Sequence, residues 1–222
     1  MADIILSKIC KQFGDKTLFQ DFSLKIERGD FLSIMGESGA GKTTLLNIMG
    51  LLDTPDSGTV ILYGQKNPSF SSRAAVELRR HYISYLFQNY GLIDTETVEN
   101  NMRIVTHFKS MNKKKERRLI AGALEQVGLQ GYEKRKVYTL SGGEQQRVAL
   151  AKVIVKSPQI IFADEPTGSL DEQNRNYVLK ILQELNHQGK TIVVVTHDPY
   201  VTKCAKHCIS LGENSKPRRA SQ

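Results

Sequence analysis

The sequence lacks any apolar run close to the ~18–20 residues that a membrane-spanning helix requires. Its strand-like apolar runs, such as Ile192–Val195, are short. The first residues, Met1–Ile4, are acidic rather than basic, and no signal-peptide core follows them. These absences predict a soluble, cytoplasmic chain that would act at a membrane only through a partner.

Cysteine is scarce, and the three cysteines are an odd number for a disulfide framework. Cys204, His207 and Cys208 place metal-binding side chains within five residues, but no second cluster completes a tetrahedral site. We therefore expect buried thiols at a helix-to-strand junction rather than a metal centre.

Acidic residues are outnumbered by basic ones, 23 to 31, which gives a net charge of +8. This excess favours a partner with negative charge, such as phosphates, nucleic acid or an anionic membrane. Several basic residues lie in two clusters, at 113–118 and 216–219. We interpret the first cluster as the solvated face of a helix, with contact to a membrane surface as the alternative.

The alternation of short apolar segments with helical periodicity predicts an α/β fold. A chain of 222 residues can form one large domain, here 1–212, with a flexible basic tail at 213–222. Between Thr97 and Tyr138 only helical spacing is found, which predicts an inserted helical subdomain at 97–138. A polar loop is expected at Gln65–Ser72, before a helix at Arg73–Arg80. The expected strands are Ile4–Cys10, Phe22–Ile26, Phe31–Met35, Thr59–Leu62, Ile83–Phe87, Gln159–Ala163, Thr191–Val195 and Cys208–Leu211.

Three helix starts are marked by capping patterns. Ser141 and Glu144 form a capping box, and Ser169 with Glu172 offers a second one. Asp198 precedes a proline, which suits the first position of a helix.

The clearest chemical motif matches the phosphate-binding pattern G-x-x-x-x-G-K-[ST] at every fixed position. Its glycines let backbone N–H groups converge on a phosphate, and the helix that follows adds its positive end. Lys42 can neutralise phosphate oxygens, and the Thr43 hydroxyl can ligate Mg²⁺. The motif therefore predicts a site for a nucleoside triphosphate formed by Gly36, Glu37, Ser38, Gly39, Ala40, Gly41, Lys42, Thr43 and Thr44.

A second motif is an apolar strand that ends in two acids, Asp164 and Glu165. Open α/β sheets bind ligands at the carboxyl ends of their strands. We expect Asp164 to join the Mg²⁺ shell and Glu165 to act as the general base on the attacking water.

The third motif, Leu140–Gln145, places a capping serine and two glycines at a helix start, which is a second anion-binding position. If this position served the chain's own nucleotide, the helical subdomain would have to fold back over it. The alternative is that it closes the nucleotide site of a partner copy in a two-fold arrangement.

In combination and order these motifs resemble those of the ATP-binding cassette (ABC) ATPases, over essentially the whole chain except the tail. The resemblance implies a P-loop NTPase core with a mostly parallel sheet, an N-terminal antiparallel β subdomain and the inserted helical subdomain. It implies ATP and Mg²⁺ as cofactors, and a signature made of Ser141, Gly142, Gly143 and Glu144 that contacts a partner's nucleotide.

Further roles follow from the same resemblance. Gln88 matches the Q-loop glutamine, which contacts Mg²⁺ and water and couples to a membrane subunit. Asp171 matches the D-loop, together with Ser169 and Leu170, and His197 matches the switch histidine on the γ-phosphate. Phe13 occupies the position of the adenine-stacking aromatic, where tyrosine is commoner; its ring stacks but donates no hydrogen bond.

Glu144, in place of the commoner glutamine, resembles the branch of macrolide-efflux, lipoprotein-release and division-associated ATPases. Gly64–Pro68 and Tyr85–Tyr90 resemble putative bacteriocin-export ATPases of the lactococcin type. These resemblances imply the ATP-hydrolysing subunit of an exporter, a dimer peripheral to the inner face of the cell membrane through a permease partner. A regulatory role in a cell-wall or division complex stays open as the alternative, and a nucleic-acid-associated ATPase, suggested by the charge, is less favoured.

Overall fold

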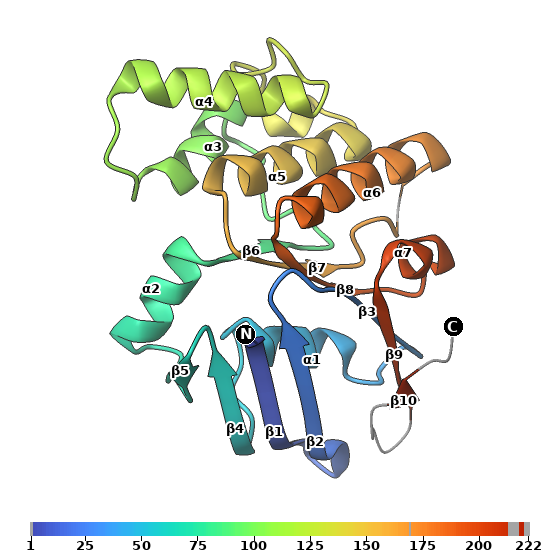
Figure 1. Ribbon diagram of the computed structural model, residues 1–222. Helices are drawn as coiled ribbons and strands as arrows, with labels where there is room; N and C mark the ends of the chain where they lie inside the picture. Colours follow the sequence, from blue (N-terminus) through green and yellow to red (C-terminus); the bar gives the residue numbers. More distant parts are fainter. Residues whose placement is uncertain (1, 169, 213–217, 220–222) are drawn as a thin grey trace.

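The structure is a computed structural model that describes residues 2–168, 170–212 and 218–219. It contains two sheets with helices packed between and above them (Figure 1). The antiparallel sheet has the strand order β2-β1-β4-β5, and the larger sheet has the order β10-β9-β3-β8-β7-β6.

The antiparallel sheet is formed by residues near the N-terminus, as the resemblance implied. Phe13 pairs with Lys16, so Gly14 and Asp15 form a two-residue turn, and the hairpin ladder runs further than the two short strands expected there. The segment Gln65–Ser72, expected to be a loop, begins with a short edge strand, because Gln65 and Lys66 pair with the end of the preceding strand. The strands are β1 (Ala2–Phe13), β2 (Lys16–Glu27), β4 (Ser57–Leu62) and β5 (Gln65–Lys66).

The larger sheet is parallel except for β10, which runs antiparallel to β9. Its central strands β7 and β8 are rich in Ile and Val and are buried on both faces. Its strands are β3 (Phe31–Gly36), β6 (Ile83–Leu86), β7 (Ile160–Asp164), β8 (Thr191–Val195), β9 (His207–Leu211) and β10 (Arg218–Arg219). Of the predicted tail, only Arg218 and Arg219 lie within the described residues.

Two apolar cores lie on the two faces of the parallel sheet. Along β7, Ile160 and Phe162 face the core shared with α1, α2 and the antiparallel sheet, while Ile161 and Ala163 face the core under α5 and α6. In Figure 1, α3 and α4 lie beyond α5. The helices are α1 (Lys42–Met49), α2 (Arg73–His81), α3 (Val98–Thr106), α4 (Lys113–Gln126), the short 3₁₀ helix η1 (Val137–Thr139), α5 (Gly142–Lys156), α6 (Glu172–His187) and α7 (Pro199–Cys204).

Two of the predicted helix starts are confirmed. The capping box of Ser141 and Glu144 starts α5, and Asp198 caps α7 with proline in its first turn. The third is wrong: Asp171 caps α6 by accepting a hydrogen bond from the Asn174 N–H, so Glu172 is the first helical residue. Ser169 lies outside the described residues.

Cys204 ends α7 and Cys208 lies in β9, so both lie at the expected helix-to-strand junction, but they are half-buried rather than buried. Cys10 is half-buried too, and all three thiols are free. No group of three or more His, Cys, Asp or Glu side chains among the described residues is placed to hold a metal ion. Across the same residues, no helix is both long and apolar enough to cross a membrane.

Candidate nucleotide site

The candidate site lies where three neighbouring parallel strands end. Ile34 of β3 and Asp164 of β7 both pair with Val195 of β8, so the three strands are in register at their carboxyl ends. The glycine-rich loop follows β3, Glu165 follows β7 and His197 follows β8. Residues that are far apart in the sequence therefore meet at one edge of the sheet, where open α/β sheets bind ligands.

The loop from Gly36 to Gly41 leads directly into α1 without a capping side chain. Gly41 occupies the N-cap position with φ of 90°, and a Cβ atom there would lie 2.9 Å from the Phe19 ring. At Gly36 a Cβ atom would lie 2.6 Å from the Leu211 carbonyl oxygen. Glycine is thus required at both ends of the loop, and no side chain caps the first N–H groups of α1.

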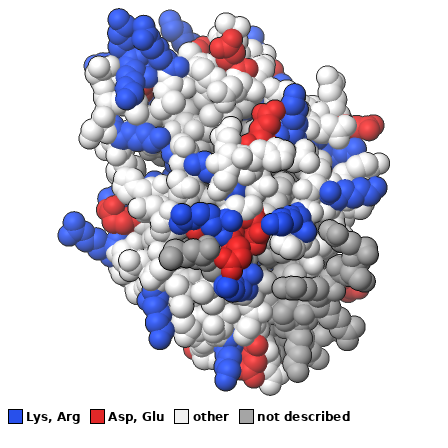
Figure 2. Space-filling model, viewed as in Figure 1, with Lys and Arg blue, Asp and Glu red and all other residues white. Residues whose placement is uncertain are grey.

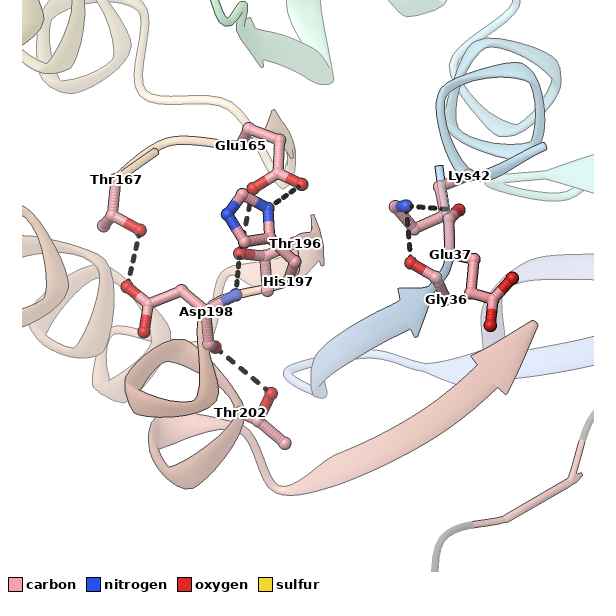
Figure 3. Close-up of polar contacts among 9 residues, drawn as sticks. All are labelled: Gly36, Glu37, Lys42, Glu165, Thr167, Thr196, His197, Asp198 and Thr202. Carbon is pink, nitrogen blue, oxygen red and sulfur yellow. Dashed lines mark hydrogen bonds and ion pairs between the residues drawn. The ribbon is translucent and has the colours of Figure 1, made fainter. Parts of the chain in front are cut away.

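Two lysine side chains contact the loop, one from the start of α1 and one from β2. Lys42 donates hydrogen bonds to the carbonyls of Gly36 (2.7 Å) and Glu37 (2.9 Å), as Figure 3 shows. Lys16, at the start of β2, donates a hydrogen bond to the Gly39 carbonyl (3.0 Å). Two ammonium groups therefore lie at a loop whose glycine-rich backbone suits an anionic ligand.

The Thr43 hydroxyl, at the start of α1, hydrogen-bonds the Asp164 carboxylate at the end of β7. Burial, together with the neighbouring charge of Glu165, raises the pKa of Asp164, and the contacts with Thr43 and Lys42 oppose that rise. A carboxylate and a hydroxyl are hard oxygen ligands of the kind that Mg²⁺ takes beside substrate phosphates. The donor set therefore fits Mg²⁺, although it is too small to hold the ion without a phosphate ligand.

The Glu165 carboxylate is held by the residues that follow β8. Thr196 donates a hydrogen bond to one carboxylate oxygen (3.1 Å), and Nδ1 of His197 lies 2.9 Å from the other (Figure 3). The Glu165 side chain is 14% exposed, whereas that of His197 is 71% exposed. Glu165 also has a φ of 46°, which is unusual for a residue other than glycine and is often found at functional sites.

The two other predicted nucleotide contacts are exposed. Gln88 follows β6, whose Leu86 pairs with Ala163, so it lies beside the end of the strand that carries Asp164. Phe13 ends β1 and is 53% exposed, with the Lys11 ammonium 5.0 Å from its ring centroid. A solvent-exposed ring is accessible to a flat ligand.

The signature residues form a separate helix start that carries a capping box. Glu144 Oε2 accepts a hydrogen bond from the Ser141 N–H (2.8 Å), and the Ser141 hydroxyl accepts one from the Glu144 N–H (3.3 Å). The Tyr132 hydroxyl donates to Glu144 Oε1 (2.8 Å). These hydrogen bonds, led by the one from the Ser141 backbone, lower the pKa of Glu144.

The residues around Gly142 and Gly143 of the signature leave little space for a side chain at either position. A Cβ atom at Gly142 would lie 3.0 Å from the Tyr90 hydroxyl, and one at Gly143 would lie 2.8 Å from the Asn174 side chain. Asn174 donates to Asp171 (2.7 Å) and accepts a hydrogen bond from Arg147. The start of α5 therefore packs against both the segment after β6 and the start of α6.

One buried amide joins α5 to the segment that follows β7. Gln146 is 2% exposed, and its side chain donates a hydrogen bond to the Pro166 carbonyl (2.8 Å), next to Glu165. By contrast, no hydrogen bond or ion pair in the described part of the chain joins Ser141–Glu144 to Gly36–Thr44. One chain brings together the phosphate loop, Asp164, Glu165 and His197, and it holds the signature elsewhere.

Sequence reasoning missed five residues of this arrangement: Lys16, Tyr132, Gln146, Asn174 and Thr196. Thr196 stands directly before His197, so its position at the end of a strand was a usable signal. The others contact their partners through the fold, and nothing in their local sequence indicates those contacts.

Comparison with known proteins agrees with this geometry. The family profile described as ABC transporter matches residues 19–168. The chain is 39% identical over 208 residues to the macrolide export ATP-binding/permease protein MacB of Campylobacter jejuni, covering 94% of this chain and 32% of that protein. It thus spans about a third of that relative. It is 43% identical to the uncharacterized ABC transporter ATP-binding protein MJ1508 of Methanocaldococcus jannaschii, with 86% of both chains covered.

Solved structures match over nearly the full length. The ATP-binding cassette MJ0796, in a dimeric post-hydrolysis state bound to ADP and phosphate, superposes with a TM-score of 0.89 at 33% identity and 99% coverage of both chains. CbiO1 from Clostridium perfringens, at 24% identity, shares the fold, with a TM-score of 0.85 and coverage of 100% of this chain and 88% of that one. This chain therefore belongs to the ABC transporter family, as an ATP-binding domain with MacB-like relatives and as an ABC-type ATPase.

Proposed function

We propose that this chain is the ATP-hydrolysing subunit of a bacterial ABC exporter and that two copies close head to tail over two ATP molecules. The observation that carries the proposal is the separation, within one chain, of the phosphate loop from the signature. In a two-fold dimer, the loop of one copy would face the signature of the other. The dimeric state of the similar cassette MJ0796 supports this arrangement.

In each site, one copy would supply the phosphate loop, Asp164 and Glu165, and the other would supply Ser141–Glu144. Lys42 would exchange its contacts with the Gly36 and Glu37 carbonyls for phosphate oxygens. Thr43, Asp164 and Gln88 would hold Mg²⁺, which when bound offsets negative charge on the phosphates. Phe13 would stack on the adenine, and Asp171 would contact the partner copy.

Glu165 would take the proton of the attacking water. Its carboxylate is already positioned by Thr196 and His197, so little reorganisation is needed when the water arrives. His197 contacts Glu165 in this structure; its predicted contact with the γ-phosphate stays a prediction.

The dimer is tested with Glu165→Gln, which keeps the size of the side chain and removes the base. We expect this variant to bind ATP, to lose hydrolysis and to elute as a dimer in light scattering when Mg·ATP is saturating. Lys180→Gln, an exposed change on α6, serves as the matched control and should behave as wild type. A Glu165→Gln protein that stays monomeric at micromolar concentration would overturn the shared site.

The membrane partner is proposed to be a permease, because the similar MacB protein is an ATP-binding/permease protein. A hollow of about 210 Å³ beside Gln88 is lined by Phe87, Tyr90, Lys152 and Lys156. Burial lowers the pKa of Lys156 to about 8, so an acidic side chain of the partner would suit this hollow. The resulting location is the inner face of the cell membrane.

Purification from membranes, followed by identification of the co-purifying integral protein, tests this partner. Phe87→Glu should abolish the association, while the exposed control Lys180→Glu should retain it. A bacteriocin, lipoprotein or drug permease would support export and name the cargo class, and the lactococcin-type group stays one of these predictions. A cell-wall or division complex would instead support the regulatory role.

A further inference from the structure

The start of α4 carries a dense cluster of positive charge. Lys113, Lys114, Lys115, Arg117 and Arg118, here called the basic surface, are all exposed. With Glu116 they make up half of the net charge of +8. Figure 2 shows Lys and Arg gathered at the end of the molecule where α4 begins.

This charge opposes the helix on which it lies. The N-terminal end of a helix carries partial positive charge, so the cations in its first turn, Lys113, Lys114 and Lys115, are destabilising. Lys113 and Arg117, and likewise Lys114 and Arg118, are like charges four residues apart, which adds repulsion. Because these cations destabilise α4, the stability of the fold does not explain their presence there.

The acid inside the cluster does not neutralise it. Glu116 is half-buried and turned inward, 3.5 Å from Nε of Arg103 and hydrogen-bonded by Thr106. No ion pair among the described residues engages the five basic side chains. Their charge therefore faces solvent without compensation.

Exposed apolar side chains lie directly before the basic surface. Phe108, in the α3–α4 connection, is 47% exposed, and Ile104 of α3 is 45% exposed. The guanidinium of Arg80 lies 4.5 Å from the centroid of the Phe108 ring, which ties α2 to this connection. Basic side chains beside an exposed ring are the composition of segments that bind at the headgroup level of a bilayer.

We propose that the basic surface binds the anionic headgroups of a phospholipid bilayer. This contact is distinct from the proposed permease interface. It would attach the chain to lipid through α4, whereas the permease would bind at the hollow beside Gln88. Phosphate groups would supply the negative charge that the helix start lacks. The neighbouring Phe108 would reach the boundary of the acyl chains, a contribution that binding to duplex phosphates would not use.

The test is flotation of the purified chain with vesicles of phosphatidylcholine containing 30% phosphatidylglycerol, compared with pure phosphatidylcholine. The patch variant changes all five basic residues to glutamine. The matched control changes five exposed lysines elsewhere to glutamine, which removes the same net charge: Lys25, Lys66, Lys134, Lys180 and Lys203. Each cation near an anionic surface contributes about fivefold to partitioning, so the patch variant should lose at least about a hundredfold. The control should stay within about tenfold of wild type.

Nucleotide binding and the melting temperature of the patch variant show whether a loss of vesicle binding comes from the lost charge or from misfolding. Nucleotide binding should be unchanged in the patch variant, which shows that it is folded, and its melting temperature should rise because the conflict with the helix dipole is gone. A patch variant that melts lower would show that the charges serve the fold, against the proposal. Equal loss of vesicle binding in patch and control variants would also overturn it, as would wild-type binding to duplex DNA but not to the anionic vesicles at the same salt concentration.

Discussion

Two helices of this molecule begin at glycine-rich motifs, and their starts are built in opposite ways. Helix α1 begins at Gly41 with no capping side chain, so its first N–H groups remain available to a ligand. Helix α5 begins with a complete capping box, in which Ser141 and Glu144 satisfy each other. The N–H groups at the start of α1 are open to an anion, while at the start of α5 the N–H groups of Ser141 and Glu144 are already bonded by side chains of the same chain.

The sign of charge differs as well. Lys42 and Lys16 lie at the loop before α1, whereas α5 has Glu144 in its first turn, with its pKa lowered by hydrogen bonds. A phosphate approaching Ser141 would meet this carboxylate, so the start of α5 is a poor site for a free anion. It becomes a good one when a lysine and a metal ion arrive with the phosphate, as in the proposed dimer.

The largest effect should come from comparing one substitution at the start of α1 with one at the start of α5. Lys42→Ala should weaken ATP binding to the single chain by at least about a hundredfold, because a charge-assisted contact is lost. Ser141→Ala should leave that affinity within about twofold, yet reduce both hydrolysis and ATP-dependent dimerisation. Fluorescent nucleotide titration at nanomolar protein measures the first quantity, and light scattering the second. Equal losses of affinity in both variants would place both motifs in the same chain's site.

A smaller effect, about tenfold in kcat, is expected for Gln146→Leu, which removes the hydrogen bond to Pro166. Because Gln146 is a positioning residue, the affinity for ATP should stay within about twofold while kcat falls. Gln126→Leu, which removes an exposed amide at the end of α4, is the control. A fall in affinity equal to the fall in kcat would contradict a positioning role.

The far end of α5 offers a test by pH. Burial lowers the pKa of Lys156 from 10.5 to about 8. Between these values the unfolded chain holds a proton that the folded chain has released, so the free energy of unfolding should rise with pH, by about 2 kcal/mol. Burial of Lys152 acts in the same direction. Urea unfolding at pH 7.5 and 10 measures the rise, and Lys156→Met should reduce it, unlike Lys180→Met on the surface of α6.

The smallest effect should come from Tyr132→Phe, which removes one hydrogen bond to Glu144. We expect a loss of about 1 kcal/mol in the free energy of unfolding at pH 7. Because the pKa of Glu144 is lowered in the folded state, this difference should shrink as the pH falls through that lowered pKa and the carboxyl is protonated. Tyr138→Phe, at a ring that is 66% exposed, should change nothing.

The sequence predicted those parts of the molecule that depend on local chemistry. The parallel strands, the capping box at Ser141 and the two acids at the end of β7 could all be predicted, because each is encoded within a few neighbouring residues. The edge strand at Gln65–Lys66 was not, since a two-residue strand exists only through its partner. The cap of α6 was misassigned because two candidates, Ser169 and Asp171, stand two residues apart.

The connections between motifs could not be predicted. Gln146 and Pro166 are twenty residues apart, and Lys16 and Gly39 are further apart still, so only the folded chain brings them together. Tyr132 lies in a segment where only helical spacing was legible, and its contact with Glu144 depends on how that segment packs. Local patterns identify the chemical groups, and the packing decides which of them act together.

The buried hydrogen bond from Gln146 has a consequence for how information could pass through the protein. A rigid helix that turned about its own axis or tilted against the sheet would carry this amide with it. The Pro166 carbonyl, and with it the adjoining glutamate, would have to follow or lose its partner. The position of the Glu165 carboxylate would then change whenever the orientation of the helical subdomain changed. A membrane protein that tilted α5 could switch hydrolysis on or off without contacting the nucleotide.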